Sequence, residues 1–315
     1  MIQTPAVYLL DVTLRDGSHA MKHQFTEEQV REIVRGLEES GIEYIEVSHA
    51  DGLGGSSIQY GFSEVDELKL IVAAAEESRR AKISVLFTPG IGLREDLQDA
   101  AKAGARMVRV ATHVMEADTA QQYIELGREL GLKTVGFLMM AHVVPVKKLV
   151  EQAKLLESYG AEAVYIADSA GTLLPQEVKE RVEALRGELQ CDVGFHAYNN
   201  LSMAVANSIA AVEAGATYID GSLRSLGAGG GNAQMEVLVA ILERMGIRTW
   251  VDLYPVMDLA DRVVASFMHR PQEITGSSLL MGYTGVYSGF LHHAHEAAEK
   301  FGVDARDILI EMGRR

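Results

Sequence analysis

The feature that most constrains the fold of this chain is an eightfold alternation of strand-like and helix-like segments. Short runs rich in Val, Ile and Tyr are strand candidates at residues 7–14, 44–49, 83–88, 107–113, 134–140, 163–169, 192–197 and 218–223. A helical pattern follows each run, beginning near residues 26, 63, 93, 119, 145, 175, 201 and 232. This alternation is typical of a parallel sheet covered by helices. Eight units predict a closed (β/α)₈ barrel of the α/β class, the TIM barrel.

Local signals support these boundaries. Thr26 can cap the first helix, because Gln29 stands three residues later and Glu27 and Glu28 face the positive end of the helix dipole. Prolines suit the first turns of two further helices, at Pro145 and Pro175. Four helices end in a glycine that favours a left-handed C-cap: Gly41, Gly104, Gly160 and Gly215.

The length divides into a barrel and an appended helical region. A closed α/β barrel uses about 250 residues, and after Thr249 the strand pattern stops. We expect residues 1–250 to form the barrel and residues 251–315 a C-terminal helical region. A doubly wound dinucleotide fold is the main rival, but no G-x-G-x-x-G follows the first strand.

Charge and cysteine content exclude several classes of partner. A net charge of -15 disfavours nucleic acid and anionic membranes as partners. The single cysteine, Cys191, fits a reducing compartment. The first residues lack the pattern of a secretory signal, and no apolar run is long enough to span a membrane. We expect a cytoplasmic protein.

Polar residues gather where the predicted strands end, and barrel enzymes carry their active sites there. Asp16 follows the first strand and His196 lies in the seventh, so only the eighth strand separates them in a closed barrel. They could share a divalent ion such as Mn²⁺, Fe²⁺, Zn²⁺ or Mg²⁺. The alternative for each residue alone is structural: Asp16 pairs with an arginine, and His196 is a core histidine. Their joint position favours the metal.

Two further features bear on mechanism. No lysine stands at the carboxyl end of a predicted strand, since Lys82 and Lys133 precede theirs, so a Schiff-base mechanism is disfavoured. A metal ion then remains as the natural stabiliser of an enolate. The glycine-rich segment 227–232 after the eighth strand could bind an anion through its N–H groups or could simply turn tightly.

The segment Asp11–Ala20, which reads DVTLRDGSHA, resembles the 4-hydroxy-2-oxovalerate aldolases. These are pyruvate-specific class II aldolases of the HMG-CoA lyase-like superfamily, also called the DRE-TIM metallolyases. The superfamily shares the Thr-Leu-Arg-Asp-Gly core, and His19 resembles the aldolase branch in particular. Segments 89–92 and 109–113 and the surroundings of Tyr287 are similar too, so the resemblance covers nearly the whole chain.

The resemblance implies retro-aldol cleavage of 4-hydroxy-2-oxopentanoate to pyruvate and acetaldehyde, a step of aromatic hydrocarbon catabolism. It implies that Asp16 holds a divalent metal, usually Mn²⁺ with Mg²⁺, Co²⁺ or Zn²⁺ as alternatives, together with residues of the seventh strand. Arg15 would stabilise the enolate and His19 would act as the base. The remaining expected substrate contacts are Leu86, Thr88, Ser169 and Tyr287.

The resemblance also implies a partner. An acylating acetaldehyde dehydrogenase would receive the aldehyde, and residues 251–315 would contact it, in a homodimer or a hetero-oligomer. Family members usually continue beyond the position of Arg315, so we expect chemistry to be better preserved than docking.

One residue departs from the family pattern. The family has His-x-His where this chain has His196-Ala197-Tyr198, so Tyr198 takes the place of the second imidazole ligand. Tyr198 could bind a metal as phenolate, water or Asn200 could fill the gap, or the metal could bind weakly. We expect a bound metal with altered affinity. The alternative functions are a Claisen-type acyl-CoA synthase or lyase of the same superfamily and a catalytically impaired scaffold subunit.

Overall fold

The computed structural model describes residues 6–287 and 290–314, and eight parallel strands close into a barrel in sequence order. The strands are β1 (Tyr8–Asp11), β2 (Tyr44–Glu46), β3 (Lys82–Phe87), β4 (Met107–His113), β5 (Lys133–Met139), β6 (Ala163–Asp168), β7 (Asp192–Ala197) and β8 (Tyr218–Gly221). The barrel closes where β1 pairs with β8, with Leu9 opposite Ile219. The predicted (β/α)₈ barrel is confirmed.

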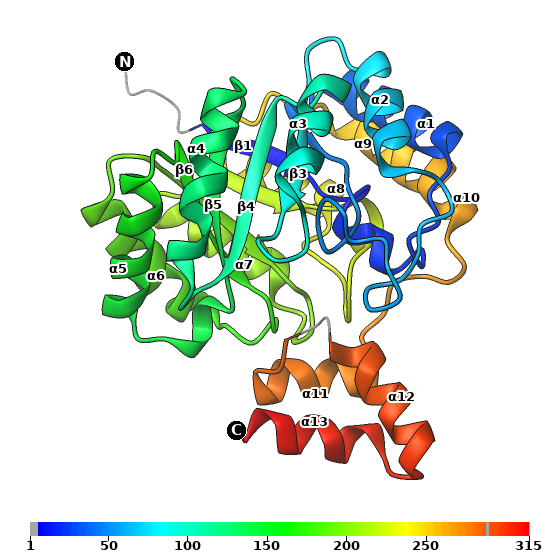
Figure 1. Ribbon diagram of the computed structural model, residues 1–315, viewed down its shortest axis with the longest axis vertical. Coiled ribbons are helices and arrows are strands. Elements are labelled where there is room, and N and C mark those ends of the chain that lie inside the picture. The colour runs from blue at the N-terminus through cyan, green and yellow to red at the C-terminus, as the bar shows by residue number, and fades with distance from the viewer. Residues whose placement is uncertain (1–5, 288–289, 315) are drawn as a thin grey trace.

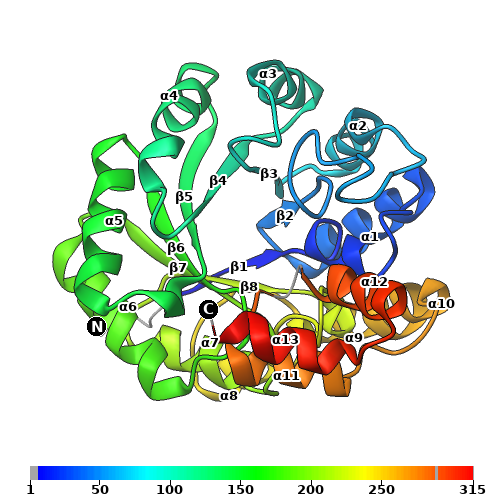
Figure 2. The ribbon, with the colours of Figure 1, turned by 60° about the horizontal axis from the view of Figure 1, so that its bottom comes forward.

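A ring of helices surrounds the strands (Figure 1). These helices are α1 (Glu27–Ser40), α2 (Glu67–Glu77), α3 (Arg94–Ala103), α4 (Gln121–Glu129), α5 (Val146–Ser158), α6 (Pro175–Glu188), α7 (Ala204–Glu213) and α8 (Met235–Arg244). Figure 2 shows them spaced around the barrel. No helix in the described part of the chain is long and apolar enough to cross a membrane.

The predicted helix signals appear as caps. Thr26 Oγ1 accepts a hydrogen bond from the Gln29 backbone N–H at 3.2 Å, and the Gln29 side chain accepts one from the Thr26 backbone N–H in return. Gly41 ends α1 in a left-handed conformation with φ 90°. Pro175 is the first residue of α6, whereas Pro145 is the N-cap of α5 rather than a residue of its first turn.

The interior of the barrel is packed with side chains and closed at its amino-terminal end. Near this end the rings of Tyr8 and Tyr218 stack with centroids 5.2 Å apart, and Tyr44 meets Tyr218 edge-on at 5.7 Å. The Lys133 ammonium lies 4.7 Å from the centroid of the Tyr218 ring. This cluster of Tyr8, Tyr44, Tyr218 and Lys133 forms an aromatic plug.

Residues after α8 form two groups of helices. The first is α9 (Leu253–Asp258), a π-helical turn (Leu259–Val264) and α10 (Ala265–Phe267), which lie beside α1. A Cβ at Gly36 of α1 would lie 2.6 Å from Leu259 Cδ1, so glycine permits this close approach.

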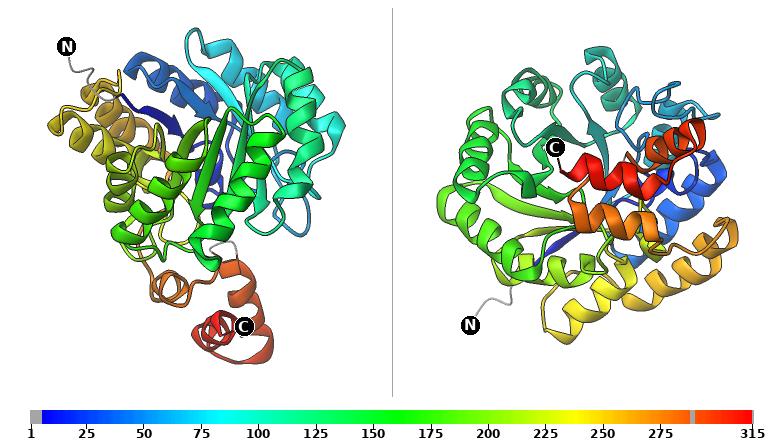
Figure 3. Two further views of the ribbon diagram at one scale, coloured as in Figure 1. Left: turned by 90° about the vertical axis from the view of Figure 1, so that its left-hand side faces the viewer. Right: turned by 90° about the horizontal axis from the view of Figure 1, so that it is seen from below.

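The second group consists of α11 (Gly276–Thr284), α12 (Leu291–Phe301) and α13 (Ala305–Gly313). These three helices share a small core of Met281, Val286, Ala294 and Leu309. They stand off from the carboxyl end of the barrel, as the left view in Figure 3 shows. The mouth of the barrel therefore faces a separate helical body.

Candidate active site

A network of fully buried charges fills the barrel near its carboxyl end. The Arg109 guanidinium on β4 donates to Glu46 on β2 at 2.7 Å and to Asp220 on β8 at 2.6 Å. Arg15, which follows β1, donates from Nε to Glu46 Oε2 at 2.7 Å. Because inward-facing positions of different strands meet inside a closed barrel, residues far apart in sequence form one network.

The charges in this network are mutually stabilised. Burial alone would raise the pKa of Glu46, but Arg109 and Arg15 outweigh it and the pKa falls to about 2. Burial opposes the charge on Arg15 as well, yet Glu46 and Asp16 raise its pKa above the usual range. Both groups therefore stay ionised at neutral pH, which keeps the Arg15 guanidinium fixed and positive.

Asp16 is the most densely hydrogen-bonded carboxylate of the site. It accepts from the Tyr198 hydroxyl at 2.5 Å, from Asn232 Nδ2 at 2.6 Å and from an Arg15 terminal nitrogen at 2.7 Å. Burial would raise its pKa, but the positive charge of Arg15 outweighs burial and holds the pKa below the usual range. The carboxylate is ionised, as a metal ligand must be.

His196 is oriented as metal-binding histidines usually are. Its Nδ1 lies 2.8 Å from Asp220 Oδ2, and a carboxylate on one ring nitrogen leaves the lone pair on the other. Among the described residues, its buried Nε2 has no hydrogen-bond partner, and neither has the buried Oδ1 of Asn232. Asp16 pairs with Arg15 as the structural alternative predicted, but His196 is left with an unsatisfied nitrogen.

Tyr198 stands where the resemblance places an imidazole, and its hydroxyl donates a hydrogen bond to Asp16. Burial and the negative charge of Asp16 raise the pKa of Tyr198 well above its usual range, so it is a neutral phenol that donates to Asp16. The Asn200 amide donates to the Ala170 carbonyl and accepts from the Gly230 N–H. Among the described residues, Asp16 and His196 offer a carboxylate and an imidazole that fit a divalent ion.

The predicted substrate residues share one small cavity of about 260 Å³ next to this network. Its wall includes Arg15, Leu86, Thr88, Ser169, His196, Tyr198 and Tyr287. The buried second terminal nitrogen of Arg15 has no hydrogen-bond partner among the residues described. Ser169 Oγ accepts from the Met140 N–H at 2.9 Å, which leaves its own proton available. The cavity thus offers unpaired donors to a bound anion.

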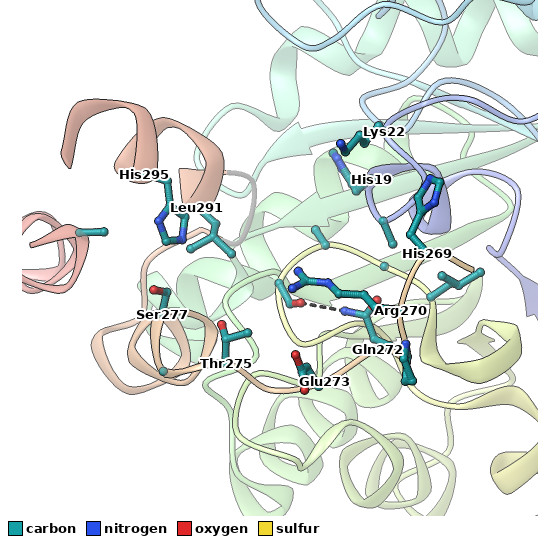
Figure 4. A pocket seen from close by; sticks show the side chains of 18 of the residues that line it. His19, Lys22, His269, Arg270, Gln272, Glu273, Thr275, Ser277, Leu291 and His295 are labelled. Carbon is teal, nitrogen blue, oxygen red and sulfur yellow. Dashed lines mark hydrogen bonds between the residues drawn. The ribbon is translucent and has the colours of Figure 1, made fainter. Parts of the chain in front are cut away.

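His19 lies outside that small cavity. It lines a larger one of about 920 Å³ between the barrel mouth and helices α12 and α13. Figure 4 shows His19 and Lys22 on one side of this space and Leu291 and His295 on the other. His19 nevertheless lies close to the small cavity, because a ring nitrogen is within 4.8 Å of a carboxylate oxygen of Asp51, a wall residue.

The glycine-rich loop after β8 serves tight packing. A Cβ at Gly227 would lie 2.7 Å from Asp16 Oδ2, and Gly231 has φ 86°. The Gly230 N–H donates to Asn200 and the Asn232 N–H to the Ser225 carbonyl, so these two groups are not free to hold an anion. The loop brings Asn232 against Asp16.

Sequence reasoning gave no role to Glu46, Asp220, Asn232 or His23. Glu46 and Asp220 stand within otherwise apolar strand segments, where a lone carboxylate at an inward position signals a buried partner. The contact of Asn232 with Asp16 had no signal, because 216 residues separate them.

Comparisons with known proteins agree with this geometry. The HMGL-like family model matches residues 6–263, and the DmpG-like communication domain model matches residues 272–315. The 4-hydroxy-2-oxovalerate aldolase of Bacillus thuringiensis is 63% identical over 98% of this chain and 91% of its own length. The protein of the same name from Geobacillus stearothermophilus is 59% identical over 98% and 90%.

Solved structures share the architecture at low identity. The carboxyl transferase domain of Rhizobium etli pyruvate carboxylase, solved with 3-hydroxypyruvate, aligns with a TM-score of 0.83 at 18% identity. The alignment covers 99% of this chain and 56% of that one. This likeness concerns the fold.

Proposed function

The chain belongs to the HMGL-like family and is an aldolase, a carbon–carbon lyase, and on that premise we propose that it cleaves 4-hydroxy-2-oxopentanoate to pyruvate and acetaldehyde. The observation that carries the proposal is the unpaired, buried nitrogen of Arg15, a residue that lines the small cavity together with His196. A fixed guanidinium there stabilises the negative charge that develops on the 2-oxo oxygen when the carbon–carbon bond breaks.

The chain's own residues account for the proton and charge movements. His19 takes the proton of the C4 hydroxyl, the C3–C4 bond breaks, and the electron pair moves onto the 2-oxo group as an enolate. Arg15 stabilises that enolate, and the proton that His19 took is then delivered to C3, which gives pyruvate and returns His19 to its neutral form. The Tyr287 phenol stays protonated, because burial and the charges of Asp51 and Asp16 raise its pKa above the usual range, so it can donate to the substrate.

A divalent ion, most favourably Mn²⁺, would be held by Asp16 and His196, and would act as a Lewis acid on the keto acid. Tyr198 would lower its affinity by occupying Asp16 as a hydrogen-bond donor. The side-chain carbonyl oxygen of Asn232 is a further neutral group that could ligate the ion beside the same carboxylate.

The aldehyde side of the cavity is the part that borders Leu86 and Thr88. We propose that acetaldehyde passes through the larger cavity to an acylating aldehyde dehydrogenase in the cytoplasm, with residues 251–315 providing the contact. The communication domain match over residues 272–315 supports this partner.

The direct test is pyruvate release from 4-hydroxy-2-oxopentanoate, with added Mn²⁺ and with chelator. Chelator-sensitive release supports a metal-dependent aldolase. Release that resists chelator supports the aldolase reaction and contradicts its dependence on a metal ion. No release with or without Mn²⁺ contradicts the proposal, and the acyl-CoA reaction and a scaffold role then become the readings to test.

A further inference from the structure

A second group of potential metal ligands lies at the barrel mouth, outside the buried charge network. His19, His23 and Asp51 each offer one ligand atom, and these atoms all lie within 4.8 Å of one another. All three side chains are partly buried. His19 and His23 come from the β1–α1 connection and Asp51 from the β2–α2 connection, so the fold brings two separate segments together here.

The backbone is bent to bring His23 back toward His19. Lys22 and His23 are consecutive non-glycine residues with φ 53° and 60°, a conformation that side chains disfavour. The His23 N–H donates to the Ser18 carbonyl at 2.8 Å, which closes the turn. The ring centroids of His19 and His23 are consequently 5.4 Å apart. Strained residues of this kind cluster at functional sites.

His49 supports the cluster without belonging to it. Its ring stacks on that of His23 with centroids 4.0 Å apart and planes inclined by 14°. His49 Nδ1 accepts from the Asp51 N–H at 3.2 Å, so Nε2 carries the proton and donates to the Gly61 carbonyl at 3.1 Å.

We propose that His19, His23 and Asp51 form a second metal site, which takes Zn²⁺ or a similar transition-metal ion and inhibits the enzyme by occupying His19. The inhibitory part rests on the proposed function, in which His19 is the base. Two imidazoles and one carboxylate, with the fourth position open to water, are a ligand set that Zn²⁺ commonly takes.

The geometry requires only a small closure. With Zn–N and Zn–O bonds of about 2.1 Å, tetrahedral ligand atoms lie roughly 3.4 Å apart. Side-chain rotation can supply the difference from the separations seen here. Imidazole ligands favour Zn²⁺ over Mn²⁺, whereas Mn²⁺ suits oxygen ligands. Different ions would therefore have opposite effects: Mn²⁺ at Asp16 supports the reaction, and Zn²⁺ at the mouth stops it.

Metal binding is tested by titrating the full-length chain with Co²⁺ and following its visible absorption, with Zn²⁺ as competitor. We expect His23→Gln and Asp51→Asn each to weaken this binding by at least about tenfold, since even loss of an outer-shell partner costs that much. His295→Gln is the matched control, because this exposed histidine faces the same large cavity from α12. Asp16→Asn changes only the buried site, so the spectrum of Co²⁺ bound by His19 and His23 should persist in this variant.

Equal Co²⁺ spectra and affinities in the parent, His23→Gln and Asp51→Asn would overturn the site. Thermal melts of each variant establish that it is folded, and two variants from different segments guard against a loss caused by the strained turn.

Inhibition is tested by pyruvate release with saturating Mn²⁺ and increasing Zn²⁺. The Zn²⁺ concentration that halves the rate should rise at least about tenfold in His23→Gln, in step with its loss of affinity. Tight binding without inhibition would overturn the inhibitory role. No aldolase activity in any protein contradicts the proposed function instead, and the Co²⁺ titration still decides whether the metal site exists.

Discussion

At the scale of single residues, Tyr198 has the largest expected effect on metal affinity. It donates to Asp16 at the position where the resemblance places a histidine, so the ionised carboxylate is hydrogen-bonded by Tyr198, Asn232 and Arg15. The site thus keeps the carboxylate of Asp16 and has a phenol at residue 198, where the resemblance places an imidazole.

We predict that Tyr198→His raises the affinity for Mn²⁺ at least about tenfold, because it removes a donor from Asp16 and adds a ligand. Titration followed by electron paramagnetic resonance of free Mn²⁺ measures this. Tyr198→Phe is the control, since it removes the phenol without supplying an imidazole, and its gain should be smaller. Equal affinities of Tyr198→His and the parent would place the ion elsewhere.

Asp168 gives the protein a pH-dependent stability. Burial raises its pKa to about 7, although the Thr172 and Leu173 N–H groups lower it in part. The unfolded chain releases this proton near pH 4, so the native state binds more protons between about pH 4 and 7, and its contribution to stability falls as pH rises through that window. The full shift corresponds to roughly 4 kcal/mol.

We therefore predict that Asp168→Asn flattens the decline of unfolding free energy between about pH 4 and 7, as measured by urea denaturation at several pH values. Ser169→Ala, at the neighbouring position, should keep the parental slope because it changes no titrating group. A slope unchanged by Asp168→Asn would show that the pKa of Asp168 is ordinary.

Much of the site could be located from the sequence, because strand ends define a barrel's active face. That rule located Arg15 and His196, and the family resemblance added Thr88 and Tyr287. All four line one cavity, but their catalytic roles stay predictions. The hydrogen bonds around Asp16 could not be foreseen, since they depend on the inward direction of side chains from loops far apart in sequence.

At the scale of elements, glycine C-caps end several barrel helices and set where the next strand begins. Gly41 has φ 90°, and a Cβ there would lie 2.5 Å from the Trp250 carbonyl oxygen. Gly302, the C-cap of α12, has φ 65° with no heavy atom within 4 Å of such a Cβ. The two positions share the backbone demand but not the steric one.

We predict that Gly302→Ala costs about 1 to 2 kcal/mol, the strain of a left-handed alanine, and that Gly41→Ala costs clearly more. Urea unfolding of the two variants measures the difference. Equal costs would mean that the segment around Trp250, between α8 and α9, moves aside without penalty.

The elements themselves followed closely from the sequence, because periodicity and caps are local. The observed ends of strands and helices differ from the predicted ones where a side chain, rather than the backbone, makes the hydrogen bond. β1 ends at Asp11, whose carboxylate accepts from the Thr13 N–H at 2.9 Å, so the predicted strand 7–14 is cut short. Asp66 caps α2 by accepting from the Leu68 N–H, and the helix starts later than residue 63.

At the scale of the whole molecule, the three helices α11 to α13 make a surface that the barrel does not use. Tyr283 and Phe301 are 78% and 67% exposed there. The sequence predicted helices in this region, but it could not predict their placement across the barrel mouth, which depends on packing between separate bodies.

We predict that Phe301→Ser weakens binding of the proposed aldehyde dehydrogenase at least about tenfold, because exposed aromatic side chains often dominate an interface. Pyruvate release should not change. Surface plasmon resonance against the dehydrogenase measures the first effect, and Tyr254→Ser, 79% exposed on α9, is the control. Loss of binding in Tyr254→Ser alone would move the interface to the other helical group.

The aromatic plug of Tyr8, Tyr44, Tyr218 and Lys133 closes the amino-terminal end of the barrel, so small molecules enter and leave at the carboxyl end. When two products share one opening, the product bound nearer the opening leaves before the product bound deeper in the barrel. On the proposed function, acetaldehyde would form nearer this opening and leave first, and pyruvate, which Arg15 would hold, would leave last. Pyruvate should then compete with the substrate in product-inhibition kinetics and acetaldehyde should not. Steady-state rates would thus reveal the order in which the two products leave.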